Sequence, residues 1–589
     1  MSEKQYNLRH TLARVFKHFR RHKFYISWGL VVTILSNAIL MASPWIVKLA
    51  IDSLKQNRAT MSDLQRYALL ILIIALTAGF FRFMMRRTLI WASRIFEYEF
   101  RNEFFRHLLG LPRSFYQNTP TGDIIARGSN DIEAVRLLVG PAVMQIGNSV
   151  ISIAVALTLM FILSWKLTLI ALAAVPILAL MTNKLVMQIH KKFFAIQEHF
   201  SKMSSFVQEN LSGIKVVKAY NQENPQIEDF SKLNKTYIDL NLSLAKTRGL
   251  FLPLIFLVVG LITLTLLYFG GRQVIAGVIT LGTLVAFIQY MMRLTWPMLA
   301  IGWTVSLFQR GTASLERINK ILDRESEIVD RPEGETPQRF EGEIEIRDLN
   351  FSYPNDERLI LKDINLKIPA GSNLALVGPT GCGKSTLVNL LVRTFQLPDG
   401  KIFIDGHDIN KIELKKLRTQ IGYVPQEAFL FSQKLSDNIA FGLEKSPADE
   451  VRRASEIAGI AEEFEEFPDG FETMIGERGV TLSGGQKQRT ALARAIISKP
   501  PILILDDAFA SVDTSTEDRI LKSLSDVIQS RTSIIIAHRI STIKNADKIC
   551  VMDQGKIIAC GNHDELIEKS PEYARIVELQ SLKQQLEAI

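Results

Sequence analysis

The sequence predicts a membrane domain of six α-helices fused to a soluble α/β domain of the P-loop class. Long uncharged runs before residue 310 predict the helices, and a strand that leads directly into a glycine-rich loop predicts the α/β domain. The composition, 47% hydrophobic and 22% charged over 589 residues, excludes a disordered or fibrous chain and leaves room for several domains.

Five uncharged runs are too long for the helices of a soluble core: 24–47, 137–165, 167–183, 249–271 and 273–292. At about 1.5 Å per residue, helices of this length span a bilayer. A sixth run, 67–81, is shorter and leads into Arg82, but an even number of spans returns the chain to its starting side. Single cations, Lys166 and Arg272, separate two pairs of runs and predict tight hairpins.

The leader, 1–23, carries seven Lys and Arg residues against one Glu, so the positive-inside rule places it in the cytoplasm. The spacing of its apolar residues predicts an amphipathic helix on the inner leaflet, and a frayed basic tail is the alternative. Because no small-residue cleavage site follows a short apolar core, we expect no removable signal peptide. The apolar residues at helical spacing are Leu8, Leu12, Val15, Phe16 and Phe19.

Charges, prolines and a glycine mark the boundary between the two halves. We expect a membrane domain over 24–322 with long cytoplasmic loops, a linker over 323–339, and the α/β domain over 340–589. Strand-like runs at 374–377, 421–424, 502–505 and 533–537 alternate with helical stretches, which is the pattern of a largely parallel sheet.

The chain has three cysteines, Cys382, Cys550 and Cys560, all in the second half. Their spacing does not match a set of metal ligands. We therefore expect neither a zinc site nor a disulfide framework, and a reducing compartment around this half.

The loop after the run 374–377 fits the pattern G-x-x-x-x-G-K-[ST] between a strand and a helix. Glycines let successive backbone N–H groups curl around phosphate oxygens, and the following helix presents its positive end. Lys384 would reach the terminal phosphates, and Ser385 would ligate magnesium. The residues of this predicted phosphate site are Gly378, Pro379, Thr380, Gly381, Cys382, Gly383, Lys384, Ser385 and Thr386.

Two further motifs fit a nucleotide site. The apolar run 502–505 ends in Asp506, a carboxylate suited to a magnesium shell beside a phosphate loop, although an ordinary strand end is the alternative. Residues 482–486 open a helical stretch with a serine cap and two glycines, which predicts a second anion-binding helix end. Its candidate residues are Ser483, Gly484, Gly485 and Gln486.

In this order and spacing, the motifs resemble the ATP-binding cassette (ABC) family, and the whole chain resembles an exporter half-transporter of the multidrug or lipid type. The resemblance implies ATP and Mg²⁺ as cofactors and an ATPase coupled to transport. It implies that Tyr353 stacks on adenine, that Gln426 senses magnesium and the membrane domain, and that His538 contacts the γ-phosphate. Magnesium would be held by Ser385, Gln426 and Asp506.

The resemblance also implies a dimer. In that family the signature loop of one cassette closes on the ATP of the other, so a chain with one of each pairs with a second half-transporter to give two composite ATP sites. The segment 511–513 resembles the loop across the dimer interface, and 477–479 resembles the exporter-type segment before the signature. Short coupling helices are implied near 121–131 and 213–222.

Position 507 departs from the family pattern. A glutamate that polarises the attacking water usually follows the strand-end aspartate, whereas this chain has Asp507, whose side chain is one methylene shorter. Because a general base must approach the water to about 2.6 to 3.2 Å, the shorter side chain should weaken base catalysis without removing ATP binding. The catalytic candidates are therefore Asp507, His538 and Gln426. Aspartate at 507 resembles one subunit of heterodimeric exporters, and a homodimer whose Asp507 works slowly is the alternative.

Polar residues within or beside the spans are costly in a bilayer unless they face the bundle or a cavity. We expect export or flipping of a lipid or hydrophobic drug across the plasma (inner) membrane, with the leader and cassette in the cytoplasm. The alternatives are a weakly hydrolysing regulatory or gating subunit and a peptide exporter. The net charge of +9 also fits a cassette protein acting on DNA or ribosomes, but the apolar spans oppose a nucleic-acid partner. The polar residues in question are Asn37, Arg82, Asn148, Gln289 and Arg293.

Overall fold

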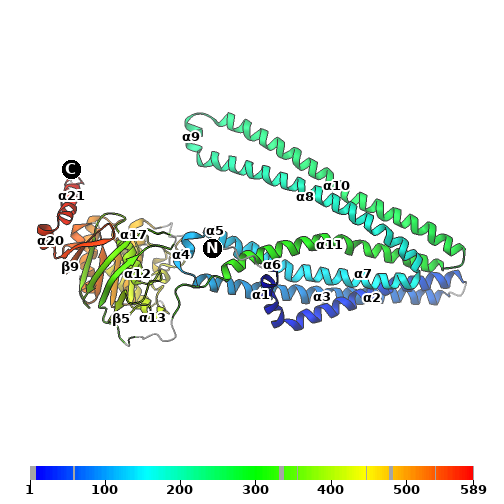
Figure 1. Ribbon diagram of the computed structural model, residues 1–589, viewed down its shortest axis with the longest axis horizontal. Helices are drawn as coiled ribbons and strands as arrows, with labels where there is room; N and C mark the ends of the chain where they lie inside the picture. The colour runs from blue at the N-terminus through cyan, green and yellow to red at the C-terminus, as the bar shows by residue number, and fades with distance from the viewer. Residues whose placement is uncertain are drawn as a thin grey trace. The chain divides into compact units, whose positions relative to one another are not determined.

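The computed structural model describes residues 8–56, 60–330, 337, 339–354, 356–445, 447–476, 482–537 and 539–587. The chain folds into two compact units, one made of Met1–Arg106 and Gly122–Asp323 and the other of His107–Thr121 and Arg324–Ile589. The first unit is helical, and the second is built around two β-sheets (Figure 1). The fold class predicted from the sequence is therefore confirmed.

Long helices make up the first unit, and α3 alone has 50 residues. Two π-helical segments, η1 (Arg127–Asp131) and η2 (Leu138–Ala142), lie within the helical stretch that leads from α5 to α7, and η2 contains Pro141. The helices are α1 (Leu8–Arg21), α2 (Lys23–Lys55), α3 (Met61–Gly110), α5 (Thr121–Ala126), α6 (Ile132–Leu137), α7 (Val143–Leu163), α8 (Trp165–Ser212), α9 (Ile214–Ala219), α10 (Glu223–Ile275) and α11 (Leu281–Leu322).

Five helices in the described part of the chain are long and apolar enough to cross a membrane: α2, α3, the helical stretch Thr121–Leu163, α10 and α11. Each contains all or most of one predicted run. The remaining predicted run, 167–183, lies in α8, and several of its side chains fall outside the described set.

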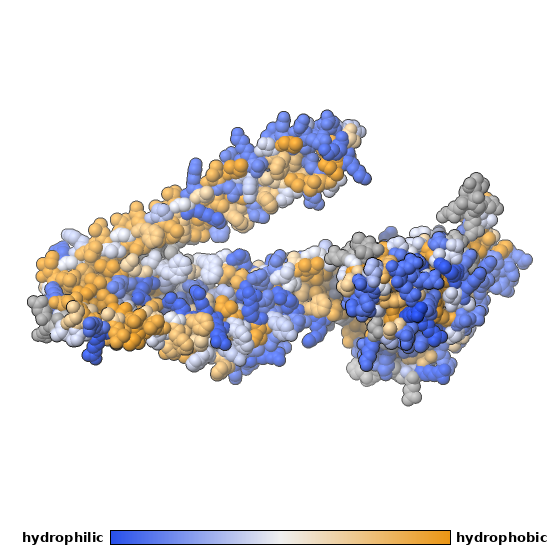
Figure 2. Space-filling view, turned by 180° about the vertical axis from the view of Figure 1, so that it is seen from behind, coloured by the Kyte–Doolittle hydropathy of each residue, from blue (hydrophilic) through white to orange (hydrophobic). Residues whose placement is uncertain are grey.

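Apolar side chains cover much of the surface of the first unit (Figure 2). A surface of this kind is unfavourable in water, whereas the hydrocarbon core of a bilayer accommodates it. The unit is therefore a membrane domain. On α10, the large apolar side chains that are more than half exposed include Leu250, Leu252, Phe256, Leu257, Leu261 and Leu264.

Both predicted hairpins are present, but the cations expected to mark their turns lie inside helices. α7 and α8 meet at Ser164, so Lys166 lies in the first turn of α8. α10 continues past Arg272, and α11 begins after Thr280. The side chains of Ser164 and Thr280 accept backbone N–H groups at the start of the next helix. A cap satisfies helix-end donors, which a lone cation cannot do, so caps rather than charges set these turns.

α1 is the amphipathic helix predicted for the leader, and the frayed-tail alternative is wrong for Leu8–Arg21. Val15 is buried on one side of the helix. The imidazole of His18 lies between two carboxylates of α3, with Nδ1 3.2 Å from Oε2 of Glu99 and Nε2 3.2 Å from Oε2 of Glu103. The helix is thus bound to protein along this side.

The second unit is a mixed α/β fold. Its main sheet has the strand order β10-β9-β3-β8-β7-β6, parallel except for the edge strand β10, and a smaller antiparallel sheet has the order β2-β1-β4-β5. The strands are β1 (Ile344–Phe351), β2 (Leu361–Ile368), β3 (Asn373–Val377), β4 (Ile402–Ile404), β5 (His407–Asp408), β6 (Ile421–Val424), β7 (Ile502–Asp506), β8 (Thr532–Ile536), β9 (Lys548–Asp553) and β10 (Lys556–Gly561).

Helices flank these sheets, and buried aliphatic side chains fill the space between them. All four predicted strands are confirmed as β3, β6, β7 and β8. The helices are α4 (Arg113–Asn118), α12 (Lys384–Leu391), α13 (Leu414–Thr419), α14 (Leu435–Ile439), α15 (Ala448–Ile457), α16 (Ala461–Glu465), the 3₁₀ turn η3 (Gly470–Glu472), α17 (Gly484–Ile497), α18 (Thr514–Gln529), α19 (Ile540–Ile543), α20 (His563–Lys569) and α21 (Pro571–Glu587).

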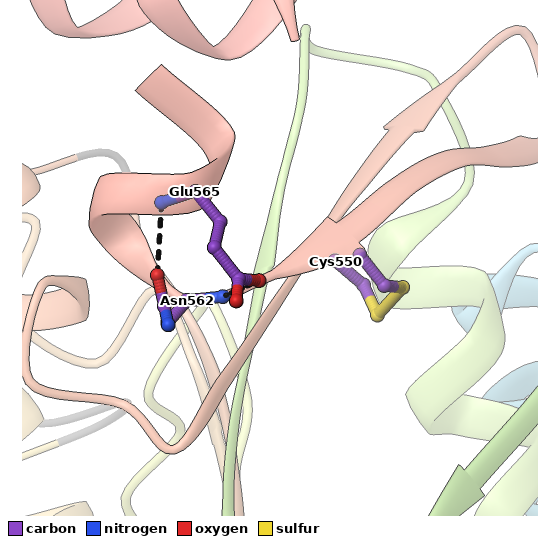
Figure 3. Close-up of a disulfide and its surroundings, with 4 residues drawn as sticks. Cys550, Asn562 and Glu565 are labelled. Atoms are coloured by element: carbon purple, nitrogen blue, oxygen red, sulfur yellow. Dashed lines mark hydrogen bonds between the residues drawn. A yellow bond between two sulfur atoms is a disulfide. The ribbon is translucent and has the colours of Figure 1, made fainter. Parts of the chain in front are cut away.

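A disulfide joins Cys550 of β9 to Cys560 of β10, a single bond that the expectation of no disulfide framework did not foresee (Figure 3). The two cysteines are directly paired in the antiparallel register, with Cα atoms 4.3 Å apart. Their spacing in the sequence does not predict this, because only the tight turn at Gln554 and Gly555 brings them opposite each other. Cys382 is free and buried.

A short segment of the first half, His107–Thr121, belongs to the second unit. Leu111 and Phe115 are buried in it, and the guanidinium of Arg324 lies 5.3 Å from the centre of the Phe115 ring. The resemblance implied a coupling helix near 121–131, but residues from Gly122 onward belong to the membrane unit. The helix that packs in the second unit is α4.

Candidate functional site

Strand β3 leads into the predicted phosphate loop and helix α12 follows it. Gly378, Gly381 and Gly383 have φ angles of 149°, 83° and 108°, a region that residues with a Cβ rarely adopt. A Cβ on Gly378 would lie 2.1 Å from the carbonyl oxygen of Met552, so this position requires glycine. The loop therefore forms an open backbone cradle at a helix N-terminus, a geometry suited to phosphate.

Lys384 curls back over this loop. Its Nζ donates hydrogen bonds to the carbonyl oxygens of Gly378 at 2.8 Å and Pro379 at 3.0 Å, and lies 3.8 Å from Sγ of Cys382. The ammonium is thus held by the loop itself at the point where phosphate oxygens would enter. Cys382 lies inside the loop, with 5% of its surface exposed.

Ser385 and Asp506 are brought together by the fold. Oγ of Ser385, in the first turn of α12, donates a hydrogen bond to Oδ1 of Asp506 at 3.0 Å. Asp506 ends the fully buried strand β7. A hydroxyl and a carboxylate beside a phosphate loop are oxygen ligands of the kind that Mg²⁺ prefers, so the pair fits the expected magnesium site.

Tyr353 lies beside the first helical turn that follows the loop. Its hydroxyl is 2.8 Å from Oγ1 of Thr386, and its ring contacts Phe351 and Phe395 edge to face, with centroids 5.3 Å away in each case. An open cavity of about 440 Å³ adjoins these rings. A phenol fixed in this way can present a ring face to a nucleobase.

The remaining catalytic candidates follow neighbouring strands. Gln426 follows β6, which pairs in parallel with β7, so its exposed side chain lies at the sheet edge that also carries Asp506. Asp507 has a φ of 53°, and its N–H donates to the carbonyl oxygen of Ile536 at 2.9 Å. Among residues with a Cβ, aspartate is enriched in this left-handed region, so the backbone favours Asp over Glu at 507. His538 lies outside the described residues.

Ser483 caps α17 with a reciprocal pair of hydrogen bonds. Its Oγ accepts the N–H of Gln486 at 3.2 Å, and Oε1 of Gln486 accepts the N–H of Ser483 at 2.9 Å. A Cβ on Gly485 would lie 3.0 Å from the carbonyl oxygen of Ser511, so the segment 511–513 packs against the signature of its own chain. The predicted segment 477–479 lies outside the described residues.

The sequence did not reveal the acid that supports this signature helix. Glu463 of α16 accepts a hydrogen bond from Nε2 of Gln486 at 3.0 Å and pairs with Arg489 at 2.6 Å. Burial raises the pKa of Glu463, but the hydrogen bonds from Arg489 and Gln486 outweigh burial and lower the pKa below its ordinary value. Since Glu463 precedes Gln486 by 23 residues, no local motif signals the contact.

Comparison with known proteins matches both halves of the chain. Residues 26–298 match the family model described as the ABC transporter transmembrane region, and residues 361–510 match the model described as ABC transporter. The ATP-dependent lipid A-core flippase of Desulfotalea psychrophila is 35% identical over 569 residues, which cover 97% of this chain and 99% of the flippase. The multidrug resistance-like ATP-binding protein MdlA of Escherichia coli is 32% identical, over 98% of this chain and 97% of its own length.

The fold also matches a solved exporter. The structure of a bacterial Atm1-family ABC exporter with ATP bound aligns with a TM-score of 0.78 and 26% identity, over 95% of this chain and 98% of the exporter. Apolar membrane helices and a phosphate-loop unit occur in one polypeptide that matches these proteins over nearly its full length. The chain therefore belongs to the ABC transporter family, as an exporter half-transporter whose ATPase is coupled to transport.

Proposed function

We propose that this chain exports or flips a lipid or hydrophobic drug across the cytoplasmic membrane, as one half of a dimeric transporter. The observation that carries the proposal is the Ser385–Asp506 pair beside a phosphate loop, in the same chain as helices with exposed apolar surfaces. The relatives named as a lipid A-core flippase and a multidrug resistance-like protein support an amphiphilic or hydrophobic cargo. The leader and the nucleotide-binding unit would lie in the cytoplasm.

In the proposed ATP site, Lys384 and the backbone N–H groups of the loop bind the phosphates. Ser385, Asp506 and Gln426 would hold Mg²⁺, which when bound would neutralise phosphate charge. Tyr353 stacks on the adenine. Asp507 and His538 act at the γ-phosphate end, with Asp507 as the base that orients water.

A second half-transporter completes each site, because this chain carries one phosphate loop and one signature helix end, Ser483 to Gln486. The helix α9, which covers most of the second implied coupling region, supports a partner. Val216 is 61% exposed and Tyr220, just after the helix, is 74% exposed, so an apolar tip remains uncovered in the single chain. A partner chain would bury such a surface.

Asp507 favours a heterodimer over a homodimer. In a heterodimer this chain binds ATP and hydrolyses it slowly, while its Ser483 end completes a competent site on the partner. The same residue favours a second candidate function, a regulatory or gating subunit that binds nucleotide with little turnover. The two differ in whether the complex moves cargo.

Vectorial transport in proteoliposomes tests the proposal. The protein is reconstituted alone and with a second half-transporter that carries glutamate after its strand-end aspartate, and ATP-dependent flipping of a fluorescent phospholipid and uptake of a hydrophobic dye are measured. We expect at least one cargo to move with ATP and to stop moving in Lys384→Ala. ATP binding without movement of either cargo would favour the regulatory candidate instead.

A further inference from the structure

Helix α4 links the longest part of the membrane domain to the nucleotide-binding unit. α3 is continuous over 50 residues, and only Leu111 and Pro112 separate it from α4. In α4, Ser114 and Phe115 are 8% and 4% exposed, so the helix is anchored by buried side chains. α4 therefore begins within three residues of the end of α3.

The first residue of α4 begins a series of hydrogen bonds that ends at the proposed magnesium site. Nη1 of Arg113 donates to Oδ1 of Asn389 at 3.0 Å. Nδ2 of Asn389 donates to the carbonyl oxygen of Ser385, one turn earlier in α12, at 2.6 Å. Oγ of Ser385 then donates to Asp506 at 3.0 Å. Residues from α4, α12 and β7 are thus connected in one path.

Asparagine is the residue type that this path requires at 389. Arginine has only donors, and a backbone carbonyl has only an acceptor, so the side chain between them must accept on one side and donate on the other. Asn389 is 8% exposed among the buried aliphatic side chains of α12, where an unsatisfied amide would be unfavourable. Leucine would fit the surroundings but would make neither hydrogen bond.

The pKa of Tyr423, in β6, responds to the charges of both Arg113 and Asp506. Burial and then the negative charge of Asp506 raise the pKa of Tyr423 to about 12, while the positive charge of Arg113 lowers it. The phenol is therefore within electrostatic reach of both Arg113 and Asp506.

We propose that Arg113 and Asn389 are positioning residues that make the magnesium affinity of the ATP site depend on the position of α4. The inference rests on the proposed placement of Mg²⁺ at Ser385 and Asp506. While Arg113 holds Asn389, the amide holds the carbonyl of Ser385 and fixes the first turn of α12. If α4 moves away, this restraint on Ser385 is weakened, so the membrane helix α3 influences the ATP site of its own chain.

Nucleotide binding at varied Mg²⁺ tests this role without depending on turnover. The fluorescent analogue TNP-ATP is titrated onto the full-length protein in nanodiscs, at a series of Mg²⁺ concentrations and in EDTA. We expect Arg113→Ala and Asn389→Leu each to raise the Mg²⁺ concentration for half-maximal effect by about three- to tenfold, the range that one hydrogen bond supports. Affinity in EDTA should stay at the wild-type value.

Four further variants separate positioning from general damage. Arg113→Lys keeps a cationic donor and should recover part of the wild-type response. Asn389→Asp keeps the acceptor for Arg113 but loses the donor to Ser385, so it should behave like Asn389→Leu. Gln117→Ala changes another exposed side chain of α4 and should leave the Mg²⁺ response unchanged. The double variant Arg113→Ala/Asn389→Leu should be no worse than the more affected single variant, because both break one path.

Ser385→Ala distinguishes failure of this inference from failure of the proposed site. If Ser385→Ala raises the Mg²⁺ requirement and the Arg113 and Asn389 variants do not, the path has no positioning role and the proposed metal site stands. If Ser385→Ala also leaves the requirement unchanged, the placement of Mg²⁺ is wrong and the inference falls with it. Additive effects in the double variant, or equal losses of affinity in EDTA, would likewise overturn the positioning role.

Discussion

Oγ of Ser385 lies 3.0 Å from Oδ1 of Asp506, although the two residues are 121 positions apart in the chain. β3, which leads toward Ser385, and β7, which ends in Asp506, flank β8 in a parallel sheet, so their carboxyl ends meet at one edge. Local sequence places Ser385 after a phosphate loop and Asp506 at a strand end, and the order of the strands brings the two residues together.

Lys384→Ala should weaken ATP binding at least tenfold, because the ammonium held over the loop supplies charge-assisted hydrogen bonds to phosphate worth about 1.5–3 kcal/mol. ATP-dependent transport should be lost and membrane insertion retained, since the loop is not part of the apolar helices. Binding of TNP-ATP and extraction of the membrane fraction measure the two effects. Lys569→Ala, at the end of α20, is the matched control and should bind normally. Equal ATP affinity in Lys384→Ala and wild type would refute the phosphate-loop assignment.

Ser483→Ala should harm the partner's ATP site more than the site of its own chain. The substitution removes the hydroxyl that caps α17 and would face the partner's phosphates, and a lost cap also lowers stability by about 1 kcal/mol. Ser483→Thr keeps a capping hydroxyl and serves as the control. Hydrolysis is measured in the complex after the catalytic carboxylate of one or the other ATP site has been removed by substitution. A larger loss at this chain's own phosphate loop would contradict the composite arrangement.

The sequence predicts the strands and the phosphate loop because both depend on local patterns. β3, β7 and β8 are apolar runs buried on both faces, and glycine is required at Gly378 by the close approach of a neighbouring backbone. The fusion of a helical membrane domain to a nucleotide-binding domain could also be predicted, because both halves show local sequence patterns. Such local patterns do not depend on which strand lies beside which.

Features that depend on register or on distant contacts could not be predicted in this way. The Cys550–Cys560 bond follows from the pairing of β9 with β10, and the support of Gln486 by Glu463 is a side-chain contact between two separate helices, α17 and α16. The contact of Arg113 with Asn389 joins residues 276 positions apart. Spacing along the chain carries no information on such pairs.

The binding of the leader helix should depend on pH. Hydrogen bonding to Glu103, opposed by burial and aided by Glu99, raises the pKa of His18 above its ordinary value near 6.5. A raised pKa means that the bound helix favours the protonated imidazole, so its stability is complete below the ordinary histidine pKa and is lost as pH rises through the raised value. Arg14 and Arg21 face the same carboxylates and keep part of the attraction at high pH.

Spin labels at exposed positions of α1 and α3, Arg20→Cys and Tyr98→Cys, can follow this change. The distance distribution should be narrow at pH 6 and broaden by pH 8.5. His18→Gln should be broad at both values, and His199→Gln in α8 should behave like the unsubstituted helix pair. A width that stays constant with pH in the wild-type background would contradict a role for His18 protonation.

The number of free thiols per chain can be measured directly. The unreduced protein, denatured in urea, should show one reactive thiol per chain, Cys382, and reduction should reveal all three. In the native protein, Cys382 should react slowly because it is 5% exposed, and bound ATP should protect it. Alkylation should block nucleotide binding in the wild type and spare Cys382→Ala. Three thiols before reduction would show that Cys550 and Cys560 are not joined.

We expect this chain to bind ATP and to hydrolyse it slowly, because the carboxylate of Asp507 is too short to align water. The φ of 53° at this position tolerates glutamate at a cost of at most about 1–2 kcal/mol, which thermal unfolding can verify. Asp507→Asn removes the base and should abolish the remaining turnover. Loss of a general base lowers rates by about 100- to 10,000-fold. Asp507→Glu, which restores the usual side-chain length, can therefore raise the rate of ATP hydrolysis by a large factor.

The most direct measurement is ATP turnover by the purified chain in nanodiscs, wild type against Asp507→Glu, with Lys384→Ala as the background. We expect stoichiometric ATP binding with slow turnover in the wild type, and at least a tenfold increase in Asp507→Glu. Brisk, cargo-stimulated turnover in the wild type that Asp507→Glu leaves unchanged would contradict this account and indicate a symmetric exporter with aspartate as its base.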